Sequence, residues 1–103
     1  MADDSPEVVT LCGSTRFRDA FEREQRRLTL EGRIVLSVGM FGHEEGLDET
    51  SPVKADLDAL HLRKIDLSQR IHVINVGGHV GSSTSREIDY AQQLGLEVTY
   101  LEP

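Results

Sequence analysis

The chain has 103 residues, 38% of them hydrophobic and 28% charged, which supports one globular domain with a modest core. Its formal net charge of -7 argues against a nucleic-acid-binding protein, because neutralising phosphates requires a clustered basic surface. The only dense basic run, Arg23 to Arg27, is interleaved with glutamates and is expected to be solvated. A small anionic ligand is compatible with this charge, since a helix N-terminus and one arginine can bind a phosphate.

No apolar run approaches the roughly 20 residues that a membrane span needs, so no membrane partner is expected. The single cysteine, Cys12, cannot form an intramolecular disulfide, and the first residues lack the basic and apolar regions of a secretion signal. We therefore expect a cytoplasmic protein. Residues 1–6 are expected to be a short flexible N-terminus, and residues 7–103 a single domain.

The first third of the chain predicts a strand, a turn and a helix. Glu7–Cys12 is short, apolar and β-branched, as buried strands are, and Gly13-Ser14-Thr15 then caps a helix. That helix runs to about Glu31, where Gly32 ends it. Its apolar positions have helical spacing and are expected to be buried: Phe17, Ala20, Phe21, Leu28 and Leu30.

The middle of the chain predicts a second strand, a long loop and a second helix. Arg33–Val38 is the strand, and Gly39–Thr50 is a glycine-rich, acidic loop of a length that commonly has a function. Ser51 and Pro52 are an N-cap and a first helical residue, and this helix continues to about Ser68. Its expected apolar stripe is Val53, Leu57, Leu60, Ile65 and Leu67.

The last third of the chain predicts a strand, a helix and a strand. Arg70–Val76 is almost continuously apolar, as a central parallel strand should be, and Leu96–Leu101 is the final strand. The order βαβαβαβ predicts an α/β fold, a small parallel four-stranded sheet in a flavodoxin-like three-layer arrangement. The helix between these strands, from about Ser83 to Leu94, is expected to bury Ile88, Ala91 and Leu94.

A strand order of 2-1-3-4 is the economical prediction for this sheet, and it places the topological switch point between the first and third strands. Ligands bind outside the carboxyl ends of the strands at such a point. Two unusual turns follow those two strands, Cys12–Arg16 and the glycine- and hydroxyl-rich segment Gly77–Glu87. We therefore expect both turns to face one cleft.

Glu87 is the main candidate for chemistry in this cleft, and two interpretations are open. Thr84–Glu87 matches the capping box, in which the glutamate bonds back to the cap amide. Alternatively, the carboxylate points across the cleft and attacks or stabilises the cationic sugar carbon that forms when an N-glycosidic bond breaks. The turns are either ordinary helix caps or groups that hold a phosphate or a base edge. The residues available for such binding are Gly13, Ser14, Thr15, Arg16, Gly81, Ser82 and Ser83.

Two motifs resemble those of the nucleoside 2-deoxyribosyltransferase-like superfamily, which includes transferases and nucleotide N-glycoside hydrolases. They are Cys-Gly-Ser-Thr-Arg-Phe at Cys12–Phe17 and the segment Val76–Ala91, which contains Glu-Ile-Asp-Tyr-Ala after its serines. The order of elements agrees over nearly the whole chain. The glycine run before Glu87 also resembles the lysine-decarboxylase-like phosphoribohydrolases. The resemblance implies a nucleotide-binding-like domain that acts on the N-glycosidic bond of a nucleoside or nucleoside monophosphate. No cofactor is expected.

The resemblance implies residue roles only where the motifs match. The nucleophilic glutamate of the superfamily falls on Glu87, its serine-glycine segment falls on Gly81–Ser83, and its N-terminal nucleotide-contacting turn falls on Gly13, Ser14 and Arg16.

One departure from the superfamily concerns the acid that orients the base or donates a proton. Active members usually carry an aspartate just before the third strand, and often another earlier on the preceding helix. This chain has Gln69 and Arg70 at the strand start, and the nearest acid is Asp66, one helical turn earlier. Asp66 therefore either substitutes for that acid or is a solvated residue.

The remaining candidates are less specific. His43 in the long loop either touches a base or is solvated, and Cys12 is expected in the core, although a thiol near a helix N-terminus can have a lowered pKa. No metal is expected, because the chain has no paired-cysteine or His-Glu-x-x-His spacing. The other histidines are too scattered in the sequence to suggest a metal site: His61, His72 and His79.

Three functions follow as hypotheses. The first is an enzyme acting on a nucleoside or nucleotide, and the second is an inactive binding module that keeps the same pocket. The third is an interaction protein whose helices form a homodimer. A homodimer is also expected for the enzyme, because in this superfamily the partner often completes the pocket.

Overall fold

The computed structural model describes residues 5–39 and 52–103. Within these residues the chain alternates between strands and helices, and two short 3-10 helices, η1 and η2, follow strands. The elements are β1 (Val8–Gly13), η1 (Thr15–Phe17), α1 (Arg18–Leu30), β2 (Ile34–Leu36), α2 (Pro52–Asp66), β3 (Arg70–Ile74), η2 (Val76–Gly78), α3 (Ser82–Gln93) and β4 (Glu97–Tyr100).

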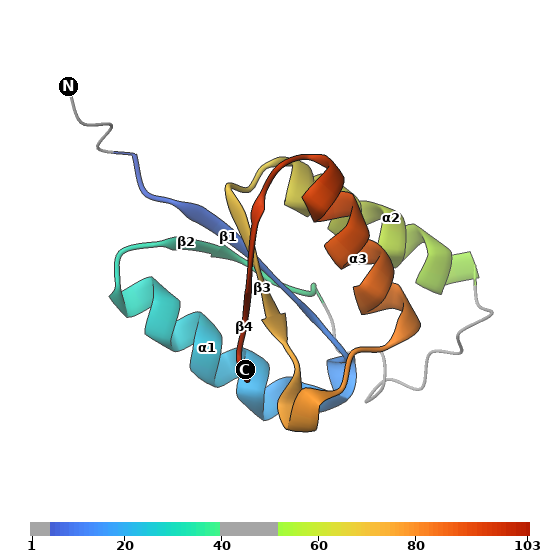
Figure 1. Ribbon diagram of the computed structural model, residues 1–103, viewed down its shortest axis with the longest axis horizontal. Coiled ribbons are helices and arrows are strands. Elements are labelled where there is room, and N and C mark those ends of the chain that lie inside the picture. Colours follow the sequence, from blue (N-terminus) through green and yellow to red (C-terminus); the bar gives the residue numbers. More distant parts are fainter. Residues whose placement is uncertain (1–4, 40–51) are drawn as a thin grey trace.

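The four described strands form one parallel sheet in the order β2-β1-β3-β4, which confirms the predicted order. Helix α1 covers one face of the sheet, and α2 and α3 cover the other (Figure 1). This three-layer α/β arrangement is compatible with a flavodoxin-like fold. Strand β2 is shorter than predicted, because only Ile34 to Leu36 pair with β1.

The hydrophobic core has two parts, one on each face of the sheet. Successive strand residues point to opposite faces, so Val9 and Leu11 of β1 pack toward α1, whereas Cys12 packs toward α2 and α3. The part under α1 consists of Val9, Leu11, Ala20, Phe21, Leu28 and Ile74. The part under α2 and α3 consists of Cys12, Ile65, Ile71, Val73 and Ala91.

Several predicted apolar stripes are only partly buried. In α2 the buried residues are His61 and Ile65, while Leu60 is 58% exposed and Leu67, directly after the helix, is 67% exposed. The prediction for these two leucines was wrong because α2 packs on the sheet through the narrow face that carries His61 and Ile65. The other predicted core residues that prove exposed are Leu30, Val53 and Leu94.

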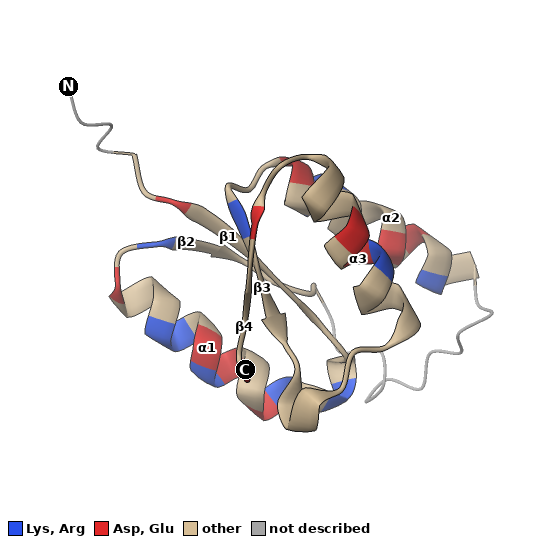
Figure 2. Cartoon of the chain, in the orientation of Figure 1, with Lys and Arg blue, Asp and Glu red and all other residues tan. Residues whose placement is uncertain are grey.

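The basic run on α1 alternates with acids along the helix (Figure 2). Arg27 pairs with Glu24 at 2.8 Å and with Glu31 at 2.8 Å, and Glu24 also bonds His72 of β3 at 2.8 Å. Arg27 of this run therefore neutralises neighbouring acids of the same helix. No helix in the described part of the chain is long and apolar enough to cross a membrane.

Gly13 has a backbone that only glycine tolerates at the end of β1. Its φ is +156°, and a Cβ added there would lie 2.8 Å from the carbonyl oxygen of Ile74 on β3. We expect Gly13→Ala to lower the free energy of unfolding by about 1–3 kcal/mol or more. The added Cβ would overpack against β3, and this cost adds to the backbone strain of the positive φ. Urea denaturation checks this, with Gly32→Ala as a control at a positive-φ glycine whose Cβ meets nothing within 4 Å. Equal losses in the two variants would contradict the close approach.

Candidate functional site

A pocket of about 370 Å³ lies at the carboxyl ends of the strands, between the β1 turn, α2 and the start of α3. This is the edge at which the two motif turns were expected to meet, and both turns do line the pocket. The volume falls in the range of small-molecule sites. The predicted residues that it brings together are Gly13, Ser14, Thr15, Arg16, Gly81, Ser82, Ser83 and Glu87.

The β1 turn presents a hydroxyl and a guanidinium to this pocket. Ser14 caps η1, and its Oγ accepts hydrogen bonds from the Arg16 backbone amide at 3.3 Å and from Arg16 Nε at 3.2 Å. Arg16 is exposed, and its guanidinium lies 6.0 Å from the centre of the Phe17 ring. Arg16 lines the pocket, so its guanidinium is placed where it can bind an anionic group of a ligand.

The start of α3 faces the pocket without a side-chain cap. Gly81 is the N-cap residue, with extended backbone and no capping hydrogen bond from a side chain, and Gly81 to Ser83 line the pocket. The helix begins at Ser82, so Glu87 is its sixth residue and not the third helical position of a capping box. The capping-box interpretation is therefore wrong, because the true N-cap lies three residues before Thr84.

Glu87 is a partly buried acid on the pocket wall. Burial raises the pKa of its carboxyl from 4.5 to about 7, a hydrogen bond with Cys12 lowers it, and the charge of Asp58 raises it. Near neutral pH both protonation states are therefore accessible to this group. A carboxylate that is poorly solvated and lies in a cleft is typical of an acid with a chemical role.

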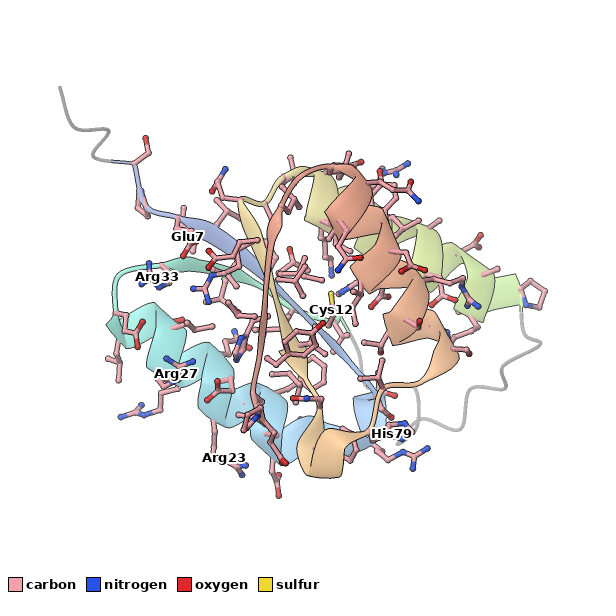
Figure 3. All side chains as sticks on the ribbon, viewed as in Figure 1. Glu7, Cys12, Arg23, Arg27, Arg33 and His79 are labelled. Atoms are coloured by element: carbon pink, nitrogen blue, oxygen red, sulfur yellow. The ribbon has the colours of Figure 1, made fainter. Side chains whose placement is uncertain are left out.

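Cys12 and His61 form a buried pair behind Glu87. Cys12 Sγ lies 3.5 Å from His61 Nε2, and burial together with the charge of Glu87 raises the pKa of the thiol well above 9.0. Burial lowers the pKa of His61 to about 4, so its imidazole is neutral at physiological pH. Figure 3 shows Cys12 on the side of the sheet that α2 and α3 cover. The ligand atoms of Cys12, His61 and Glu87 all lie within 4.8 Å of one another.

Helix α2 contributes polar residues to the pocket that sequence reasoning missed. Lys54 donates to both oxygens of Asp58, at 2.7 and 2.9 Å, and reaches Ser83 Oγ of α3 at 3.4 Å. Lys54, Asp58 and His61 follow an i, i+4, i+7 pattern, which places them on one helix face. This spacing is a signal in the sequence for a polar helix face, although the apolar residues of the same helix do not mark that face as the buried one.

The structure does not bring Asp66 to the pocket. Asp66 ends α2, accepts a hydrogen bond from the Tyr90 hydroxyl and pairs with Arg63 at 2.7 Å. It lies about 12 Å farther along the helix axis than Asp58, at 1.5 Å per residue, toward the amino ends of the strands. The position just before β3 also lies there, since Gln69 Oε1 accepts from the Val8 amide and Arg70 bonds Glu7. His43 lies outside the described residues.

A second cavity, of about 880 Å³, lies at the opposite edge of the sheet, at the amino ends of the strands. At this edge Glu7 pairs with Arg33 at 3.1 Å and with Arg70 at 3.0 Å, so these three charged residues satisfy one another. Figure 3 labels Glu7 and Arg33 close to each other. Parallel sheets bind ligands at the carboxyl edge. The smaller pocket beside Glu87 is therefore the candidate functional site.

Neither the models of protein families nor the curated proteins with which the chain was compared contain a match. The fold and the pocket define a class, an α/β protein with a polar cleft at the carboxyl edge of a parallel sheet.

Proposed function

We propose that the protein cleaves the N-glycosidic bond of a nucleoside or nucleoside monophosphate, by hydrolysis or by transfer of the sugar to a second base. The observation that carries this proposal is the position of Glu87, a carboxyl on the wall of a pocket of about 370 Å³ that both motif turns line. Burial raises the pKa of this carboxyl to about 7. The resemblance of the Cys12–Phe17 and Val76–Ala91 motifs to deoxyribosyltransferase-like proteins supports the same activity.

In the proposed reaction the ionised Glu87 oxygen attacks the anomeric carbon of the sugar. The bond between this carbon and the base nitrogen breaks, and its electron pair leaves with the base, which takes up a proton from solvent water. An oxocarbenium-like transition state forms beside the carboxylate, whose negative charge stabilises it. Water or a second base then attacks the anomeric carbon and releases Glu87. A water nucleophile gives the free sugar, and a base gives a new nucleoside.

The two turns suit the sugar and phosphate of such a substrate. The amides at the start of α3 and the positive end of its dipole favour an anion, and Arg16 adds a guanidinium on the opposite side. Ser14 and Ser83 are positioned for hydroxyl groups. A nucleoside monophosphate therefore fits the charge distribution of the pocket better than an uncharged nucleoside.

Asp58 replaces Asp66 as the proposed partner of the base. It lines the pocket with Glu87 and accepts two hydrogen bonds from Lys54, which fixes its side chain. A carboxylate held in this way can accept a hydrogen bond from an exocyclic amine or a ring N–H. Asp58 thus orients the base while Glu87 attacks the sugar.

Incubation of the protein with a panel of ribo- and deoxyribonucleoside monophosphates, with and without a second free base, tests the activity. Chromatography of the products should show base release or base exchange for at least one member of the panel. The absence of both, at enzyme concentrations near that of the substrate, would contradict the proposal.

Asp66→Asn is expected to leave base release unchanged, since Asp66 contacts Arg63 and Tyr90 and not the pocket. Asp58→Asn is expected to lower kcat/KM by about 10- to 100-fold, because a hydrogen bond from the base to a charged acceptor contributes roughly 1.5–3 kcal/mol. Steady-state kinetics of the two variants check this. A large loss for Asp66→Asn with none for Asp58→Asn would reverse the assignment.

The dependence of activity on pH gives another expected outcome. Because the attacking group is a carboxylate with a pKa of about 7, kcat/KM should rise about tenfold per pH unit below 7 and level off above it. Initial rates between pH 5 and 9 in buffers that contain EDTA measure this profile. A plateau that extends down to pH 5 would show that Glu87 does not limit the reaction.

An inactive nucleotide-binding module is the second candidate function. The pairing of Asp58 with Lys54 favours it, because a proton donor for the leaving base is then missing from the acids of the described pocket wall. This candidate predicts that a nucleotide raises the melting temperature without turnover, by about 2.7 kcal/mol of stabilisation at 100 times Kd. A homodimer remains a prediction for either candidate.

A further inference from the structure

We propose that Cys12, His61 and Glu87 form a binding site for a zinc ion at the inner end of the pocket. We further infer that zinc bound there competes with the substrate, and this second part alone rests on the proposed function. The site combines a sulfur, a nitrogen and an oxygen ligand from three separate elements, β1, α2 and α3.

The geometry of the three ligands suits tetrahedral zinc. With Zn–S of about 2.3 Å and Zn–N of about 2.05 Å, tetrahedral coordination separates the sulfur and nitrogen by about 3.6 Å. Cys12 Sγ and His61 Nε2 lie 3.5 Å apart. All three ligand atoms lie within 4.8 Å of one another, so a rotation of the flexible Glu87 side chain completes the third bond. The buried pair already has the separation that the ion requires.

The ligand chemistry is that of a zinc centre. Thiolate, imidazole and carboxylate are the three side-chain types that zinc prefers, and three protein ligands leave a fourth position open. A hydrogen bond to the backbone of Leu11 is among the influences on the pKa of His61, so its ring also interacts with β1. His61 and Glu87 both line the pocket, so the open position faces it.

Metal binding is chemically balanced without any further reactant. The Zn–S bond forms as the Cys12 thiol releases its proton to water, and no oxidation or reduction takes place.

The two lysines near the site have acceptors elsewhere. Lys54 is paired with Asp58, and Lys64 donates to the carbonyl oxygen of Ser37 at 2.6 Å. Both ammonium groups therefore have acceptors of their own.

Zinc at this site removes the nucleophile of the proposed reaction. A carboxylate oxygen that is bound to the ion donates its electron pair to zinc and is no longer available to attack a sugar carbon. The ion also fills the inner end of a pocket of only about 370 Å³. Zinc should therefore raise the apparent KM for a nucleotide substrate.

Titration of the metal-free full chain with Co²⁺, followed by displacement with Zn²⁺, tests the site without any substrate. We expect one Co²⁺ per chain, with the absorption of a thiolate-to-cobalt bond and of tetrahedral cobalt. Cys12→Ser should abolish the thiolate band. His61→Gln and Glu87→Gln should each weaken Co²⁺ binding by more than about 100-fold, because loss of a residue that only hydrogen bonds to a ligand costs about 10- to 100-fold in metal affinity. His79→Gln is the matched control, because His79 lines the same pocket outside the cluster.

Circular dichroism of each metal-free variant checks that it is folded, and Glu87→Gln is informative even if Cys12→Ser unfolds, since Glu87 is only partly buried. Co²⁺ affinity that Glu87→Gln leaves unchanged, or that His79→Gln reduces equally, would overturn the site. Metal binding without any nucleotide turnover would support the site and contradict only the proposed function. Turnover that Zn²⁺ does not inhibit, in a protein that binds it at Glu87, would overturn the competition.

Discussion

Glu87→Gln is expected to reduce the release of base from a nucleoside monophosphate by at least about 10³-fold, the order of loss when a nucleophile or an acid–base group is removed. The amide keeps the shape and the hydrogen-bonding capacity of the side chain but cannot form the bond to the sugar or carry the negative charge. The loss should appear in kcat, because the bond to Glu87 forms only as the reaction proceeds. Single-turnover measurements with enzyme in excess check it.

Asp89→Asn is the matched control, since Asp89 is an exposed acid on the same helix. It should retain the full rate, while both variants should keep their affinity for the nucleotide. Turnover by Glu87→Gln close to that of the unmodified protein would eliminate Glu87 as the nucleophile. A rise in KM with unchanged kcat would show that Glu87 only binds the substrate.

The same substitution is expected to make the protein more stable above pH 7, by up to about 3 kcal/mol. The folded state holds the Glu87 proton up to about pH 7, whereas an unfolded chain releases it near 4.5. Because the folded state binds more protons in this window, the free energy of unfolding falls as the pH rises from 4.5 to 7. Glutamine does not ionise and escapes this loss.

Urea denaturation of both proteins at pH 4.5 and at pH 8, with EDTA present, measures this difference. The two proteins should differ least at pH 4.5, and Glu87→Gln should be the more stable at pH 8. Asp89→Asn should follow the pH dependence of the unmodified protein. Identical pH dependence for Glu87→Gln would contradict the raised pKa. A gain in stability together with a loss of activity is the usual relation at a site where function strains the fold.

The fold was largely predictable from the sequence. Apolar runs such as Arg70–Val76 and the glycines that end the helices were enough to predict four parallel strands. The order of the strands was predicted only as the economical arrangement, and the structure confirms it. Burial within the helices was less predictable, because the helical period identifies an apolar face but not how much of it the sheet covers. Leu30 and Leu94 are apolar residues near helix ends, beyond the edge of the core.

The pocket was predictable in part. Glycine and hydroxyl residues after β1 and β3 identify its two turns, because parallel strands bring their carboxyl ends to one edge. The Cys12–His61 pair was not predictable, since its members are 49 residues apart and belong to different elements. Of the two roles left open for Asp66, the position does not support the acid in the cleft, because proximity to β3 in the sequence places a residue at the amino edge of that strand.

Cys12, His61 and Glu87 are far apart along the chain, so the pocket exists only when three separate elements are folded together. The pocket takes its walls from β1, α2 and α3, so no single unit of strand and helix contains a binding site. Local opening of any one of these elements dismantles it, and a bound ligand stabilises all of them together. Ligand occupancy therefore slows amide hydrogen exchange across the central strands, including those amides that no ligand touches.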